Sequence, residues 1–271
     1  MPVRRHRARL SRRPAPRIVA STRRLRHLLL DALLPIACIG CGGPVRGFAA
    51  DDGPLCGTCR LNAPWPAPPL CASCGVPLGP PSHAVVATTT CAPCRRHPPA
   101  FATARGAALY QPAPEPSPLV AAVHALKYRR ERALALSLAA LVMARLPVPH
   151  GVLVVPVPLH PARLRERRFN QAALIAASIA RRSGRPLAVR ALVRRVPTSP
   201  QAGLGAGERR RNLHAAFAVP RPSAVAGRRI LLVDDVITTG ATADACARAL
   251  RHAGAVRVDV YAAGRTPIGA P

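Results

Sequence analysis

Apolar residues follow two spacings along residues 101–265, and each spacing predicts a different kind of element. Short runs rich in apolar residues have the length of buried strands, and they occur at 101–110, 152–157, 229–233 and 256–262. Between them, apolar residues recur at the spacing of amphipathic helices over 119–146, 167–182 and 241–253. Alternating strands and helices predict an α/β fold in which a largely parallel sheet is flanked by helices.

The segment before residue 101 is organised differently. Residues 1–20 are arginine-rich without apolar periodicity, which predicts a disordered tail. Leucines at helical spacing predict an amphipathic helix over residues 21–34, which Pro35 ends. We therefore expect four parts: the tail, this helix, a cysteine-bearing module over 35–100 and the α/β domain over 101–265.

Charge is distributed unevenly along the chain. The 271 residues carry 40 Lys and Arg against 11 Asp and Glu, a net charge of +29, part of which a GC-rich genome would account for. Ten arginines and no acid occupy residues 1–30, whereas residues 31–100 carry a net charge of only +1. The near-neutral cysteine module is unsuited to gripping DNA phosphates by itself, while the basic ends predict anionic partners. The tail is open to three interpretations: a solvated tail or misplaced start, a nucleic-acid tether, or a targeting segment.

Neither a membrane span nor export is predicted. No run approaches 18 uninterrupted apolar residues, and the basic amino terminus lacks the apolar core of a secretory signal. We therefore expect a cytoplasmic protein with no membrane span. The sequence leaves its oligomeric state open.

Eight of the nine cysteines form two sets with nearly the same internal spacing. In each set, two Cys-x-x-Cys pairs are separated by 14 or 16 residues. The sets are Cys38, Cys41, Cys56 and Cys59, followed by Cys71, Cys74, Cys91 and Cys94. Such a pair turns both thiolates toward one metal ion, and the second pair completes a tetrahedron. Four disulfides are the alternative, but they suit an oxidising compartment. The spacing therefore predicts two structural Zn²⁺ ions in a double zinc-ribbon module.

The run Ile-Leu-Leu-Val-Asp-Asp-Val-Ile-Thr-Thr-Gly-Ala-Thr at 230–242 carries the most specific chemistry. An apolar strand delivers Asp234 and Asp235 to its carboxyl end, where α/β sheets place their binding sites. The turn that follows offers backbone amides and hydroxyls at the start of a helix, which is a cradle for one phosphate. Carboxylates would normally repel a neighbouring phosphate. Their presence here is explained if they hold sugar hydroxyls and a metal ion lies nearby.

This run resembles the phosphoribosyl pyrophosphate signature of type I phosphoribosyltransferases. The resemblance implies that Asp234 and Asp235 hold the ribose hydroxyls, and we assign them as the catalytic pair. The ligand-binding set it implies is Asp234, Asp235, Val236, Thr238, Thr239, Gly240, Ala241 and Thr242. The implied ligand is phosphoribosyl pyrophosphate or a related nucleotide, bound with Mg²⁺.

A second run, Val-Pro-Val-Pro-Leu-His-Pro at 155–161 followed by Phe-Asn-Gln-Ala at 169–172, resembles the ComF family of competence-associated phosphoribosyltransferase homologues with an amino-terminal zinc module. One departure is Arg168, where the family pattern has glycine. The resemblance implies a diphosphate-binding turn and a lid. Their residues would be Lys127, His160, Arg163, Arg167, Arg194, Arg195, Gln201, Arg209 and Asn212. The ordinary alternatives are a solvated Lys127, an arginine-rich surface helix, and an Asn170–Gln171 pair that only caps a helix.

Three functions remain open at this point. The first is an enzyme that transfers a phosphoribosyl group to an unknown acceptor. The second is a non-catalytic factor that keeps the nucleotide pocket and acts in DNA uptake or processing with single-stranded DNA and a helicase-type partner, as the family's link to competence implies. The third is a general DNA-binding zinc protein, which the scarcity of aromatic side chains makes less suitable for stacking bases.

Overall fold

The structure is a computed structural model that describes residues 36–45, 55–79, 90–111, 117–195 and 215–267. Its small elements are β1 (Ile36–Ala37), β2 (Pro44–Val45), α2 (Gly57–Leu61), α3 (Ala92–Arg96), α6 (Pro161–Arg167), β5 (Val193–Arg194), β6 (Phe217–Ala218) and η1 (Pro222–Ala224). The main strands are β3 (Thr103–Leu109), β4 (Val152–Pro156), β7 (Arg229–Ile237) and β8 (Arg257–Arg265). The main helices are α4 (Pro118–Tyr128), α5 (Leu134–Arg145), α7 (Gln171–Ser183) and α9 (Ala241–His252).

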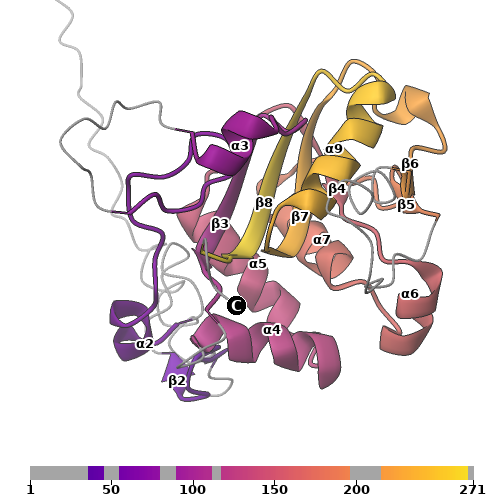
Figure 1. Cartoon of the computed structure of the whole chain (residues 1–271). Coiled ribbons are helices and arrows are strands. Elements are labelled where there is room, and N and C mark those ends of the chain that lie inside the picture. Colours follow the sequence, from indigo (N-terminus) through magenta and orange to yellow (C-terminus); the bar gives the residue numbers. More distant parts are fainter. Residues whose placement is uncertain (1–35, 46–54, 80–89, 112–116, 196–214, 268–271) are drawn as a thin grey trace, which may run out of the picture.

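The central sheet has four parallel strands in the order β3-β8-β7-β4 (Figure 1). Helices α5 and α7 pack on one face, and α9 contacts β7 and β8 on the other. Side chains along β7 alternate between two hydrophobic cores, with Ile230 and Leu232 facing α9 while Leu231 and Val233 face α5 and α7. The predicted parallel sheet flanked by helices is therefore confirmed.

Both cysteine segments are part of these cores. Cys71, Cys74 and Cys91 are buried in the core on the α9 face, whereas Cys38 is buried in the core on the α5–α7 face. In Figure 1, α3 lies at the top near the strands of the sheet, and β2 lies at the bottom near one end of α4. The cysteine modules thus share apolar packing with the sheet and its helices.

The helix expected over 167–182 is α7, which begins four residues later than predicted, and a separate short helix, α6, ends at Arg167. Arg168 ends α6 with a left-handed backbone, at a φ of 68°. Asn170 then caps α7, because its side-chain oxygen accepts a hydrogen bond from the amide of Ala173 at 3.3 Å. A left-handed residue that ends a helix explains the glycine in the family pattern at this position.

Replacing Arg168 with glycine should stabilise the protein by about 1 kcal/mol, because glycine adopts a left-handed backbone without a Cβ clash. The matched control is Gly184, which ends α7 at a φ of 66° and has open space where a Cβ would lie. Gly184→Ala should therefore destabilise by about the same amount. Urea denaturation of both variants checks the prediction, and a loss of stability in Arg168→Gly would contradict it.

The predicted tail, the helix over 21–34 and most of the predicted lid lie outside the described residues. The domain boundaries at residues 35, 101 and 265 remain predictions. Among the described helices, none combines the length and apolar character that crossing a membrane requires.

Candidate functional site

The acidic pair lies near the carboxyl end of β7, one residue beyond its pairing with β4. Val233 is the last β7 residue that pairs with β4, and the strand continues through Asp234 and Asp235 to Ile237. Asp235 is only 4% exposed, while Asp234 is half-buried. The side chain of Asp234 accepts a hydrogen bond from the amide of Asp235 at 2.9 Å. Because neighbouring strand residues point to opposite faces, the two carboxylates have different surroundings.

Asp235 is held by two side chains from the helices that cover the sheet. The ammonium group of Lys127, in the last turn of α4, forms an ion pair with one carboxylate oxygen of Asp235. The side-chain amide of Gln171 donates to the other oxygen at 3.4 Å. Burial would lower the pKa of Lys127, but the Asp235 carboxylate outweighs it and raises that pKa above its ordinary value. The solvated interpretation of Lys127 is therefore not what the structure shows.

The charged form of Asp234 is disfavoured by its surroundings. Burial and the adjacent Asp235 raise its pKa well above the ordinary value, although the Asp235 amide and the charge of Lys127 oppose the shift. A cation or hydroxyl donors placed beside Asp234 would favour its charged form. This is the environment expected for a carboxylate that binds a ligand.

The turn after β7 exposes polar groups at the start of α9. Thr238 and Thr239 are exposed, whereas Gly240 is buried and left-handed, at a φ of 84°. The Thr239 hydroxyl accepts a hydrogen bond from the amide of Ala241 at 3.3 Å. α9 begins at Ala241 and runs for 12 residues, so its first amides and its dipole favour an anion at this turn.

The predicted diphosphate residues divide into several groups. His160 caps α6, since its ring nitrogen accepts from the amide of Ala162 at 3.2 Å. The Arg167 guanidinium lies over the ring of Tyr128, 5.5 Å from its centre. Tyr128 follows Lys127 at the end of α4, and its side chain is exposed.

Arg194 is another basic residue of the predicted diphosphate-binding set. Its guanidinium lies 5.4 Å from the centre of the Phe217 ring. Burial and the nearby positive charge of Arg163 lower the pKa of Arg194, while Asp234 acts in the opposite direction. Arg195 is exposed, and its amide donates to the carbonyl of Ala216 at 2.7 Å. The remaining predicted residues, Gln201, Arg209 and Asn212, lie outside the described residues.

Two residues near the site escaped the sequence-based assignment. Gln171 was placed in a family motif but was given no site role, although it contacts Asp235. Arg265 ends β8 and donates to the carbonyl of Thr238 in the predicted phosphate turn. The available signal for Arg265 was a lone basic residue at the end of the run Val-Tyr-Ala-Ala-Gly at 260–264.

The eight predicted cysteine ligands gather into two clusters, and the structure leaves all nine cysteines unbridged. Within each cluster, the four sulfur atoms lie within 4.8 Å of one another. The Sγ atoms of Cys41 and Cys56 are 3.7 Å apart, as are those of Cys74 and Cys91. A zinc–sulfur distance of about 2.3 Å gives a tetrahedron with edges of about 3.8 Å. Both clusters therefore fit a tetrahedral Zn²⁺ ion.

The same backbone hydrogen bond recurs in both clusters. The amide of the third cysteine donates to the sulfur of the first, at 3.2 Å from Cys56 to Cys38 and 3.3 Å from Cys91 to Cys71. Burial raises the pKa of each first cysteine, but these donors and their neighbours lower it to about 7 for Cys38 and about 6 for Cys71. Amide donors thus favour the thiolate, which is the form that binds metal.

Comparisons with known proteins agree with these features. A family model described as a double zinc ribbon domain matches residues 29–95. Competence protein F of Haemophilus influenzae is 38% identical over 114 residues, which is 41% of this chain and 49% of the relative. The DNA utilization protein YhgH of Salmonella typhi is 35% identical over 206 residues, covering 73% of this chain and 84% of the relative. This chain belongs to the ComF family.

The YhgH protein of Escherichia coli K12 is a further relative of this ComF-family chain, 32% identical with the same coverage of 73% and 84%. A solved structure of the allosteric regulatory enzyme of purine biosynthesis overlaps 46% of this chain and 24% of its own, at 23% identity and a TM-score of 0.32.

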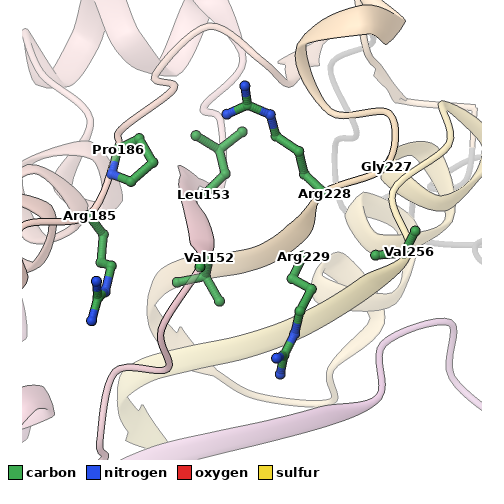
Figure 2. A pocket seen from close by; sticks show the side chains of 9 residues that line it. Val152, Leu153, Arg185, Pro186, Gly227, Arg228, Arg229 and Val256 are labelled. Carbon is green, nitrogen blue, oxygen red and sulfur yellow. The ribbon is translucent and has the colours of Figure 1, made fainter.

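A pocket of about 500 Å³ lies at the amino ends of β4 and β7, opposite the acidic pair (Figure 2). Arg185, Arg228 and Arg229 line it. Figure 2 shows that the side chains of Arg228 and Arg229 extend in opposite directions, so their charges do not converge on one point. None of the predicted site residues lines this pocket, and we keep the carboxyl end of β7 as the candidate site of the ComF-family chain.

Proposed function

We propose that this chain binds phosphoribosyl pyrophosphate with Mg²⁺ at the β7–α9 turn and transfers the phosphoribosyl group to an acceptor. The observation that carries the proposal is the pair of unlike carboxylates one turn before a helix amino terminus. Asp234 accepts hydrogen bonds from the ribose hydroxyls, and residues 238–242 receive the 5′-phosphate through backbone amides. Lys127 and Gln171 hold Asp235, which orients the end of β7.

In the proposed transfer, the bond between the ribosyl carbon and the diphosphate breaks, and the diphosphate leaves with the electron pair. The acceptor forms the new bond to that carbon and releases its proton to solvent or a nearby base. Bound Mg²⁺ supplies charge neutralisation for the diphosphate, and Asp234 is the carboxylate that would hold the ion with the ribose. Arg163 and Arg194 offer further positive charge to the diphosphate. One guanidinium group can also donate two parallel hydrogen bonds to phosphate oxygens.

Asp234→Asn should weaken the binding of phosphoribosyl pyrophosphate by about tenfold or more. A hydrogen bond to a charged group contributes about 1.5–3 kcal/mol, and about 1.4 kcal/mol corresponds to tenfold. Titration calorimetry with Mg²⁺ measures the affinity, and assays of diphosphate release over a panel of acceptors test turnover. Glu131→Gln, which removes an exposed carboxylate, is the control and should bind like the parent. If the parent protein does not bind this ligand, the proposal fails.

The same variant should be more stable than the parent without ligand, and the gain should depend on pH. A raised pKa means that the folded state favours protonated Asp234, so the parent loses stability as pH rises from 3.8, the ordinary value, through that raised pKa. Asparagine is neutral throughout and can still accept from the Asp235 amide. The gain should therefore be absent near pH 4 and grow toward neutral pH, as measured by urea denaturation at each pH.

Association with DNA is a second candidate, favoured by the names of relatives that are DNA utilization and competence proteins. The chain carries the net charge of +29 that weak, sequence-independent binding needs. A single-stranded oligonucleotide should bind less tightly as salt rises, with a logarithmic slope of about −0.7 for each phosphate contacted. Removing residues 1–27, which hold ten arginines, should reduce that slope. Salt-insensitive or strongly sequence-specific binding would contradict this electrostatic account. A helicase-type partner is part of the same proposal.

A further inference from the structure

Arg265 is a buried cation whose side-chain hydrogen bonds to the described residues go to backbone carbonyls. The residue is 4% exposed at the end of β8. Its Nη1 donates to the carbonyls of Ile237 and Thr266, both at 3.1 Å, and to that of Thr238. Its Nε donates to the carbonyl of Cys74 at 3.0 Å. One rigid guanidinium group therefore joins the predicted phosphate turn to a metal-binding pair of cysteines.

Holding these carbonyls fixes the direction of the amides in the turn. The peptide group is planar and trans, so its carbonyl and its N–H point in opposite directions. With the Thr238 carbonyl turned toward Arg265, the amide of Thr239 points away from Arg265. The positive charge of Arg265 also lies behind the turn, where it favours an anion on the exposed side. Both effects prepare the turn for a phosphate before the ligand arrives.

The second cysteine cluster is tightly docked on the sheet at this place. The amide of Ala104 in β3 donates to the carbonyl of Ser73 at 2.7 Å. At Gly75, with a φ of 68°, an added Cβ would lie 2.4 Å from the carbonyl oxygen of Ala104. The loop between Cys71 and Val76 therefore approaches β3 more closely than a side chain would permit.

The segment that leaves this cluster supports the other side of the turn. The amide of Ala100 donates to the carboxylate of Asp244 in α9 at 2.6 Å. The ring of Phe101 lies 4.0 Å from the place where a Cβ on Gly240 would be. The second cluster thus reaches the turn both through Arg265 and through residues 100–101.

The first cluster has different neighbours. An added Cβ on Gly40 would lie 2.7 Å from Cβ of Pro118, at the start of α4. In the described part of the chain, its hydrogen bonds do not reach residues 238–242. This difference supplies an internal control.

We propose that Arg265 is a positioning residue that couples the second cysteine cluster to the phosphate-binding turn. Metal bound by Cys71, Cys74, Cys91 and Cys94 then sets how tightly the turn holds a 5′-phosphate, while metal in the first cluster does not. The inference rests on the proposed function, because it assigns the 5′-phosphate to this turn.

The test compares the full-length parent with Arg265→Gln and Arg265→Lys by titration calorimetry against ribose 5-phosphate and against inorganic diphosphate. Arg265→Gln should lose about tenfold or more in affinity for ribose 5-phosphate and keep its affinity for diphosphate within about twofold. Arg265→Lys keeps the charge but not the fork, so its loss should be smaller. A purely structural defect would reduce both affinities together, and that result would overturn the inference.

The metal arm compares Cys94→Ser with Cys59→Ser, which are partly exposed ligands of the second and first clusters. Each variant should lose one metal ion per chain, but only Cys94→Ser should lose affinity selectively for ribose 5-phosphate. Equal effects of the two variants would overturn the coupling. If the parent binds phosphoribosyl pyrophosphate with Mg²⁺ while Arg265→Gln binds ribose 5-phosphate normally, the coupling fails and the proposed function stands. If the parent binds neither ligand, the proposed function itself has failed.

Discussion

Chelating the metal from the cysteine clusters should lower the unfolding temperature of the whole chain, not only that of an amino-terminal module. The core that β7, β8 and α9 share also buries Cys71, Cys74 and Cys91. Without a metal ion, the thiolates of these three residues would remain close together inside that core. Structural zinc contributes about 10–16 kcal/mol to folding in isolated finger peptides. Even part of this contribution is comparable to the stability of a typical domain, about 5–15 kcal/mol.

Metal analysis and calorimetry before and after chelation measure this effect. The protein purified without chelator should hold two Zn²⁺ ions per chain, Cys56→Ser should hold one, and Cys246→Ala, which changes the cysteine outside both clusters, should hold two. A metal content near zero with disulfides in place would refute the zinc assignment. An unfolding temperature that chelation leaves unchanged would refute the shared core.

The cysteine sets and the α/β order could be predicted because each depends on residues close together in sequence. The spacing of Cys38 and Cys41 indicates one metal ion whatever surrounds it, and the apolar run before Asp234 indicates a buried strand by itself. Both features appear in the structure at the expected places.

The contacts that connect distant parts could not be predicted. Lys127 meets Asp235 across 108 positions of sequence, and Arg265 meets Cys74 across 191. Composition and periodicity carry no information on such pairings, because they depend on how finished elements pack. The left-handed backbone of Arg168 was not predicted either, although the glycine of the family pattern at this position was the available signal.

Breaking the Lys127–Asp235 ion pair should cost several kcal/mol of stability. The Lys127 side chain is 19% exposed and that of Asp235 is 6% exposed, so water compensates poorly for either group left alone. Removing one partner of a buried pair costs about 3–5 kcal/mol, and the residual exposure of Lys127 places this pair toward the lower end. We therefore expect a loss of about 3 kcal/mol for Lys127→Met and for Asp235→Asn, measured by urea denaturation.

The double variant decides whether the pair itself is responsible. Because Lys127→Met with Asp235→Asn removes both charges of the ion pair together, it should be clearly more stable than the sum of the single losses implies. Arg248→Met is the control, because the Arg248 side chain is 39% exposed and its partner Asp244 still accepts a hydrogen bond from the Ala100 amide, so the loss should be less than about 1 kcal/mol. Additive losses in the double variant would mean that Lys127 and Asp235 stabilise the fold separately. The interpretation that Lys127 organises the acidic pair would then be wrong.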